Sequence, residues 1–134
     1  YLNDLDHAVN EKCEQKPTMV RYADDLLILC KPGQGAGLQT RLKRWLEAEA
    51  LGLLAADLAH YCARADVPVP QLGLSRATRR WGSCSGKGVI RINWRLVMAP
   101  PSVLDYVAAH EVAHMVEMNH SDRFWAVVAR LYPA

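Results

Sequence analysis

The 134-residue sequence predicts one α+β domain preceded by a short β-hairpin, and three patterns support this prediction. Residues 38–65 repeat apolar side chains at three- and four-residue steps, which is typical of an amphipathic helix. Residues 69–94 alternate in strand fashion around glycine turns, which predicts a small, mainly antiparallel sheet. Residues 102–131 return to helical spacing with a break near Ser121, which predicts two more helices.

The composition is that of an ordinary soluble globular domain, with 51% hydrophobic and 22% charged residues. No apolar run approaches the roughly 20 residues that a membrane span needs. The formal net charge of +2 comes from the part after residue 37, because residues 1–37 are slightly acidic. This mild basic excess leaves nucleic-acid contact open, but a solvated surface is the favoured interpretation. The candidate contacts are Arg76, Arg79, Arg80 and Lys87.

The four cysteines form no CxxC pair and have no disulfide-like spacing. They are Cys13, Cys30, Cys62 and Cys84. Reduced thiols are the simplest interpretation, and with no recognisable secretory signal they indicate a cytoplasmic protein. Cys84 lies in a Ser-Cys-Ser stretch and is a candidate nucleophile, but a buried structural thiol is the favoured role.

The N-terminal segment predicts a β-hairpin over residues 18–30. Its centre, Tyr22-Ala23-Asp24-Asp25, resembles the YADD hairpin of group II intron-type reverse transcriptases, and the resemblance covers about residues 1–33. In that family Asp24 and Asp25 would hold Mg²⁺ for nucleotidyl transfer. The third metal-binding aspartate of the family has no counterpart, so we expect an inert, fused fragment and no functional reverse transcriptase.

The glycine-rich segment Pro32–Gly37 predicts a flexible joint that breaks regular structure. We place the domain boundary there, which separates residues 1–37 from residues 38–134. The helix that follows should end near Ala65, before Pro68. Its apolar stripe comprises Leu38, Leu42, Trp45, Leu46, Leu54, Leu58, Tyr61 and Cys62.

Turn and cap signals divide the remaining chain into strands and helices. The expected strands are residues 69–76, 79–84 and 89–94. Prolines before Ser102, and Ser102 with Asp105 as a capping box, predict the start of the second helix. A final helix should begin near Ser121 and return Phe124 and Trp125 to the core.

The second helix contains His110-Glu111-Val112-Ala113-His114, an HExxH pattern. Residues four apart share one helix face, so both imidazoles can bind one Zn²⁺. Glu111 then stands where a general base can accept a proton from a water on that metal. Such water has a pKa near 7, which makes hydrolysis of a peptide carbonyl the predicted chemistry.

His120 is the predicted third ligand, six residues after His114. Six helical steps would carry it off the metal-binding face, so the helix must end first. Asn119 accepts the left-handed conformation that such a turn needs. Glu117 and Asp122 are rival ligands. Three protein ligands leave the fourth tetrahedral position open, as in catalytic zinc sites.

The ordered motifs of residues 38–133 resemble YgjP-like metal-dependent hydrolases, a family related to the SprT and WLM peptidases. The matching motifs are Arg80-Trp81-Gly82-Ser83-Cys84-Ser85, Ile92-Asn93-Trp94-Arg95-Leu96, Ala99-Pro100-Pro101, Leu104-Asp105-Tyr106-Val107, His110-Glu111 with His114, and Asn119-His120-Ser121 with Phe124-Trp125. The resemblance implies a minimal gluzincin-like zincin with zinc on three histidines, Glu111 as base, and peptide or protein substrates. The zinc ligands so implied are His110, His114 and His120.

By analogy with zincins, the strand at residues 89–94 is expected to bind an extended peptide by β-augmentation. Tyr106, one helical turn before His110, is a candidate for oxyanion binding or for packing. Two alternatives stay open: a catalytically silent zinc-bearing binding module, associated with nucleic acid in one version, and a nonfunctional fusion product.

Overall fold

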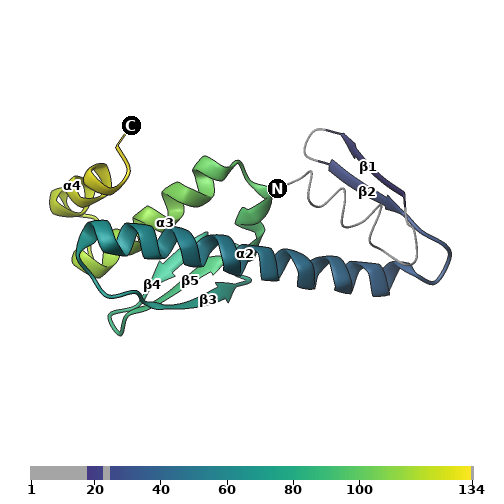
Figure 1. Ribbon diagram of the computed structural model, residues 1–134, viewed down its shortest axis with the longest axis horizontal. Coiled ribbons are helices and arrows are strands. Elements are labelled where there is room, and N and C mark those ends of the chain that lie inside the picture. The colour runs from purple at the N-terminus through teal and green to yellow at the C-terminus, as the bar shows by residue number, and fades with distance from the viewer. Residues whose placement is uncertain (1–17, 23–24, 134) are drawn as a thin grey trace. The chain divides into compact units, whose positions relative to one another are not determined.

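The structure is a computed structural model that describes residues 18–22 and 25–133. Its elements are β1 (Thr18–Tyr22), β2 (Asp25–Leu29), α2 (Gly35–Ala65), β3 (Gln71–Ser75), β4 (Gly82–Cys84), β5 (Val89–Asn93), the 3-10 helix η1 (Trp94–Met98), α3 (Pro101–Val116) and α4 (Asp122–Leu131), as Figure 1 shows. The chain divides into two compact units, residues 1–45 and 46–134. The class is α+β, as predicted.

The N-terminal unit contains the predicted hairpin. Strands β1 and β2 pair antiparallel, with a register that runs from Thr18 opposite Leu29 to Tyr22 opposite Asp25. The middle of the YADD sequence, Ala23 and Asp24, lies outside the described residues. The predicted hairpin strands are therefore confirmed, whereas the Asp24-Asp25 pair, expected to be inert, lies partly outside the described residues.

Helix α2 begins at Gly35, three residues earlier than expected, so the glycine-rich joint is shorter than predicted. The chain turns before this helix: the Gln34 amide donates to the Lys31 carbonyl at 3.1 Å, and Gly33, inside this turn, adopts φ +83°.

The second half of α2 supplies one wall of the core in the unit of residues 46–134. Leu46, Leu54 and Leu58 of the predicted stripe are buried, and Ala50, which the prediction did not include, is buried between them at the same four-residue step. The helix ends as predicted after Ala65, and the features of this end are a Schellman motif. Asp66 adopts φ +57°, and the Val67 amide donates to the Cys62 carbonyl at 3.1 Å.

The three-stranded sheet has the order β3-β5-β4 and is mixed, so the prediction of a mainly antiparallel sheet is wrong. Strand β5 pairs antiparallel with β4 through a hairpin but parallel with β3. Two reversals of the chain separate β3 from β5, so these strands run in the same direction. In the central strand β5, Ile90 and Ile92 are fully buried.

The second helix starts differently from the prediction. Pro100 is the N-cap of α3 and makes no side-chain cap hydrogen bond, so the Ser102–Asp105 capping box is wrong. The Asp105 carboxylate instead accepts a hydrogen bond of 2.7 Å from the Tyr61 hydroxyl of α2. The start of α4 agrees with the prediction, because the Ser121 hydroxyl accepts from the Phe124 amide at 3.4 Å.

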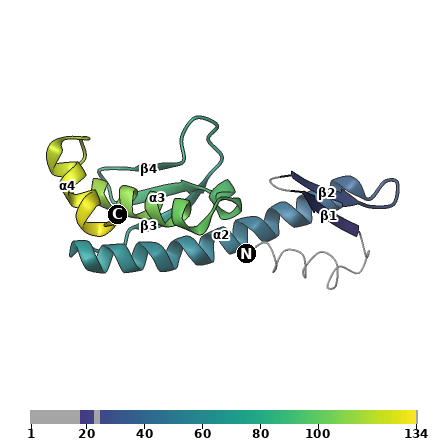
Figure 2. The ribbon, with the colours of Figure 1, turned by 90° about the horizontal axis from the view of Figure 1, so that it is seen from above.

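Within the unit of residues 46–134, α3 contacts β4, η1 and α4. Figures 1 and 2 both show the sheet and α3 alongside the C-terminal half of α2. Across residues 18–22 and 25–133, none of the helices has the length and apolar character that crossing a bilayer requires. The strand β4 and the helix α3 together position the residues of interest.

The left-handed residue at the end of α2 gives a test of this helix end. An Asp66→Gly change should raise the free energy of unfolding by about 0.5–1 kcal/mol, because glycine adopts positive φ without the Cβ penalty. Urea unfolding measures the change. The matched control, Ala63→Gly in the same helix, should lower stability by about 0.5–1 kcal/mol. A loss of stability in Asp66→Gly would contradict the Schellman end.

Candidate metal centre

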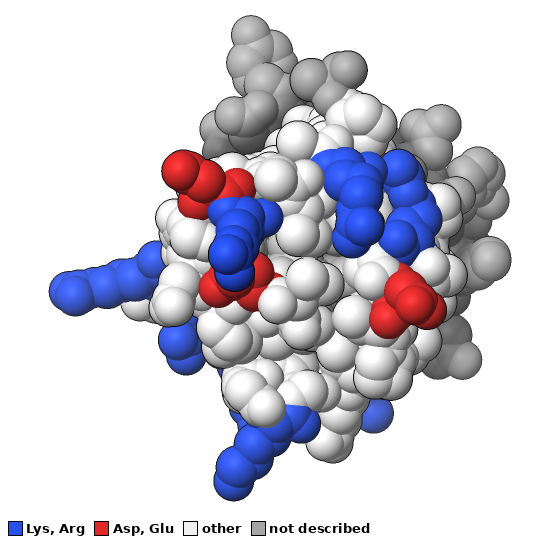
Figure 3. Space-filling model, turned by 90° about the vertical axis from the view of Figure 1, so that its left-hand side faces the viewer, with Lys and Arg blue, Asp and Glu red and all other residues white. Residues whose placement is uncertain are grey.

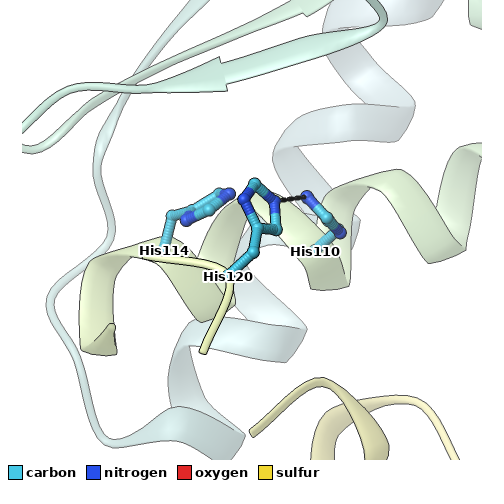
Figure 4. Close-up of side chains that lie close together, drawn as sticks. All are labelled: His110, His114 and His120. Carbon is cyan, nitrogen blue, oxygen red and sulfur yellow. Dashed lines mark hydrogen bonds between the residues drawn. The ribbon is translucent and has the colours of Figure 1, made fainter. Parts of the chain in front are cut away.

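The structure brings the three predicted histidines together. His110 and His114 project from α3, and His120 projects from the segment between α3 and α4 (Figure 4). One ligand atom from each lies within 4.8 Å of the others. The Nε2 atoms of His110 and His120 are 3.3 Å apart.

This spacing fits a zinc ion. With Zn–N bonds of about 2.0–2.1 Å, ligand nitrogens at two corners of a tetrahedron stand about 3.3–3.4 Å apart. The Nε2–Nε2 distance of 3.3 Å between His110 and His120 equals this edge. Three imidazoles form a ligand set that suits zinc and other borderline metals.

The turn that delivers His120 differs from the prediction. Asn119 is not left-handed, since Asp66 is the one non-glycine residue with positive φ in the described chain. The helix α3 instead ends at Glu117, whose backbone is extended (φ −138°, ψ 113°). The Ser121 amide then donates to the Asn119 carbonyl at 2.7 Å and closes the turn. An extended residue is enough to redirect the chain, so no left-handed residue is needed.

Glu117 supports the site through its backbone. Its carbonyl oxygen lies 3.3 Å from Nδ1 of His114, where Nδ1–H can donate and leave Nε2 free as a ligand. Its carboxylate lies 3.5 Å from the Asn119 amide. Among the residues with described side chains, neither rival ligand, Glu117 or Asp122, joins the group of converging ligand atoms.

Phe124 of α4 is the floor of the site, a role that the sequence did not reveal. Its ring stacks on His114 with centroids 4.4 Å apart, and it meets His120 at 4.6 Å and His110 at 4.9 Å edge to face. Phe124 is fully buried. The sequence predicted it only as a core residue of the last helix; its position four residues after His120 was the available signal.

The surroundings of His110 and His114 favour the uncharged form of both rings. Burial, with the neighbouring imidazoles of His114 and His120, lowers the pKa of His110 to about 4. Burial also lowers the pKa of His114. At neutral pH the His110 ring is therefore uncharged, the form that metals bind.

Glu111 points its carboxyl group into the protein, against strand β4. It is 5% exposed, and its Oε2 has no hydrogen-bond partner within the described residues. Burial raises its pKa to about 7, and the nearby positive charge of Arg80 partly opposes this rise. A buried carboxyl group without hydrogen-bond partners lowers the stability of the fold. Groups of this kind with shifted pKa values are common at functional sites.

Two of the other predicted candidates, Cys84 and Arg76, have structural explanations. Burial, with the nearby charge of Glu111, raises the pKa of the Cys84 thiol, which disfavours the reactive thiolate. Cys30, Cys62 and Cys84, the cysteines whose side chains are described, are all free thiols. Arg76, a candidate nucleic-acid contact, forms an ion pair of 3.0 Å with Glu47.

Comparison with protein families agrees with this geometry. Residues 5–134 match the family described as YgjP-like, metallopeptidase domain. The chain belongs to this family. No curated protein and no solved structure matches it.

Membership of the YgjP-like metallopeptidases makes the protein a hydrolase of a family that acts on peptides or proteins. The match begins at residue 5 and includes most of the segment that resembles a reverse transcriptase. It therefore gives no support to the interpretation of residues 1–37 as a fused polymerase fragment. The group of converging histidines lies entirely in α3 and the segment that follows.

Gly82 offers a test of the Glu111 position. A Cβ at Gly82 would overlap the Glu111 carboxyl group and lie 2.7 Å from its Cγ. We expect Gly82→Ala to displace Glu111 and to cost about 1–3 kcal/mol of unfolding free energy. The control is Gly73→Ala in β3, where the new Cβ would meet Arg91 Cγ at an ordinary 3.5 Å. Equal stability of the two variants in urea would contradict this placement.

The raised pKa of Glu111 gives a second test, in metal-free protein. Its folded-state pKa of about 7 exceeds its ordinary value of 4.5, so the carboxyl destabilises the fold progressively as pH rises between these values. The Glu111→Gln variant lacks this charge. Its stability advantage over the parent should grow from pH 4.5 to 7 and then level off, by at most about 3 kcal/mol. A pH-independent difference in chelator-treated samples would refute the buried, protonated carboxyl.

Proposed function

We propose that this protein is a zinc-dependent peptidase in which His110, His114 and His120 bind the metal and Glu111 is the general base. The observation that supports this most directly is the convergence of three imidazole ligand atoms within 4.8 Å. The adjacent Glu111, buried and with a raised pKa, supplies the second half of an HExxH site.

Each residue has a defined task in this proposal. When bound, zinc supplies Lewis acidity that lowers the pKa of a water and polarises a carbonyl. His114 is oriented by its Nδ1 contact with the Glu117 carbonyl, and Phe124 packs against all three imidazole rings. Glu111 accepts the proton of the attacking water and passes it to the leaving amine. Its pKa of about 7 suits both transfers at neutral pH.

The substrate cannot add to the strand that the sequence indicated. Strand β5 lies between β3 and β4 and is paired on both sides, so β-augmentation at residues 89–94 is wrong. Strand β4 (Gly82–Cys84) is an edge strand and contacts α3. We therefore propose β4 as the strand that pairs with an extended peptide.

The remaining proposals concern the organisation and surroundings of the enzyme. We assign the catalytic chemistry to residues 38–134 and place the protein in the cytoplasm, where its free thiols would stay reduced.

Tyr106 packs between His110 and Tyr132, at ring distances of 6.1 and 5.6 Å, which favours its packing role. Figure 3 shows separate basic and acidic groups on one face of the molecule, not the continuous basic surface that favours nucleic acid.

The direct test combines metal analysis with substitution. The parent should bind one zinc per chain and hydrolyse an unfolded protein substrate such as casein. Glu111→Gln should retain zinc and lose about 10²–10⁴-fold in kcat, because the base is absent while the ligands stay. His120→Ala should lose stoichiometric zinc and, with it, activity.

The matched control is Glu117→Gln, which alters a neighbouring carboxylate outside the ligand group. It should keep zinc and at least half of the activity. Zinc that binds with full stoichiometry but supports no turnover in the parent would favour the silent binding module. A protein that takes up no zinc when it is supplied would refute the proposal as a whole.

A further inference from the structure

A cavity of about 310 Å³ opens beside the start of strand β4. The loop of residues 77–81 forms most of its wall, and Asn93 and Arg95 complete it. None of these residues belongs to the group of converging histidines. The cavity is therefore a separate feature of the same edge of the fold, at the small end of the range typical of ligand pockets.

The charge of this cavity is one-sided. Three of its lining residues are arginines (Arg79, Arg80 and Arg95), and none of its lining residues is acidic. Arg76, just before the loop, is already paired with Glu47 and does not line the cavity. Guanidinium groups match carboxylates with two parallel hydrogen bonds, so such a cavity favours an anionic group.

Buried Asn93 holds the cavity in shape. It is 3% exposed, and its side-chain amide donates to the Ala77 carbonyl at 2.8 Å. Its backbone amide donates to the Trp81 carbonyl at 2.7 Å, so one residue ties both ends of the loop. Its Oδ1 accepts from the Arg95 amide at 3.1 Å. The Arg95 guanidinium lies over the Trp94 ring, 4.9 Å from its centroid. The cavity is thus formed before any ligand arrives.

The position of the cavity connects it to the proposed reaction. Trp81 lines it, and the next residue, Gly82, begins edge strand β4 and contacts Glu111. A peptide paired with β4 would carry its side chains past both Glu111 and the arginines. Trp81 is 56% exposed and offers an apolar wall for the methylene stem of a long acidic side chain.

We propose that this cavity is a specificity pocket for a carboxylate of the peptide substrate, bound by Arg79, Arg80 and Arg95. The proposal rests on the peptidase function above and adds a substrate preference to it. The carboxylate can come from a Glu or Asp side chain or from the C-terminus of the substrate, because both present the same planar group. Arg79 and Arg95 are the residues to vary, since Arg80 also acts on Glu111.

The test measures binding and not turnover. Alanine-rich octapeptides, acetylated and amidated, would carry a single Glu or a single Gln at each position in turn. Isothermal titration against full-length Glu111→Gln protein, with and without zinc, should show at least one Glu peptide that binds about tenfold tighter than its Gln partner. In the double variant Arg79→Gln/Arg95→Gln, the Glu peptide and its Gln partner should bind equally. An octapeptide with a free C-terminus and no Glu tests whether the carboxylate comes from the C-terminus of the substrate.

Arg44→Gln, at an exposed arginine outside the cavity, is the matched control and should keep the Glu preference. An unchanged thermal midpoint of the double variant excludes misfolding as the cause of a loss, and Arg79→Gln alone serves if that midpoint falls. Equal binding of Glu and Gln peptides, with no gain from a free C-terminus, would overturn the pocket. A phosphoserine peptide that binds tighter than its Glu counterpart, with that advantage lost in the double variant, would overturn the carboxylate assignment. A Glu preference without hydrolysis in the parent would support the pocket and contradict the peptidase function.

Discussion

The close packing of the Glu111 carboxyl group against Gly82 is the constraint on which the rest of the site depends. It fixes α3 against the short strand β4 at a distance that no side chain at position 82 would permit. Because Glu111 lies between His110 and His114 in sequence, the same contact sets how the histidines are presented. The carboxyl group loses its hydration there without gaining a described hydrogen bond, and this loss is tolerated only because hydrophobic burial elsewhere outweighs it. The core formed by α2 and β5 supplies that burial.

The third histidine depends on a different set of interactions. An extended Glu117 ends α3, and the same residue offers its carbonyl to His114, so chain reversal and ligand orientation have one cause. Phe124 then packs against all three rings from α4. Since α4 begins at a cap supplied by Ser121, directly after His120, local sequence signals determine where this aromatic floor stands.

Elements governed by local chemistry could be predicted from the sequence, whereas those governed by long-range pairing could not. The stripe of α2, the Ser121 cap and the shared helix face of His110 and His114 follow from spacing that a few neighbouring residues determine, whereas the turn predicted to bring His120 to them was wrong in detail. The parallel pairing of β3 with β5 joins residues on either side of an intervening strand, and no local pattern encodes it. The hydrogen bond between Asp105 and Tyr61 could not be predicted either, because the two residues are distant in sequence.

Strand β4 lies next to both Glu111 and the arginine-lined cavity. It has only three residues, yet Glu111 contacts its first residue and the arginine-lined cavity lies immediately before it. A strand so short gains little stability from its own pairing, so its position depends on contacts with α3 and β5. Asn93, the last residue of β5, also holds the loop that lines the cavity. In the proposed function, a peptide that pairs with β4 would therefore meet Glu111 and the arginine-lined cavity, which are held by one continuous packing arrangement. If the cavity binds a substrate carboxylate, replacing Asn93 should weaken the substrate preference and leave zinc binding unchanged. The reason is that Asn93 holds the cavity loop, whereas the histidines are held by α3 and α4.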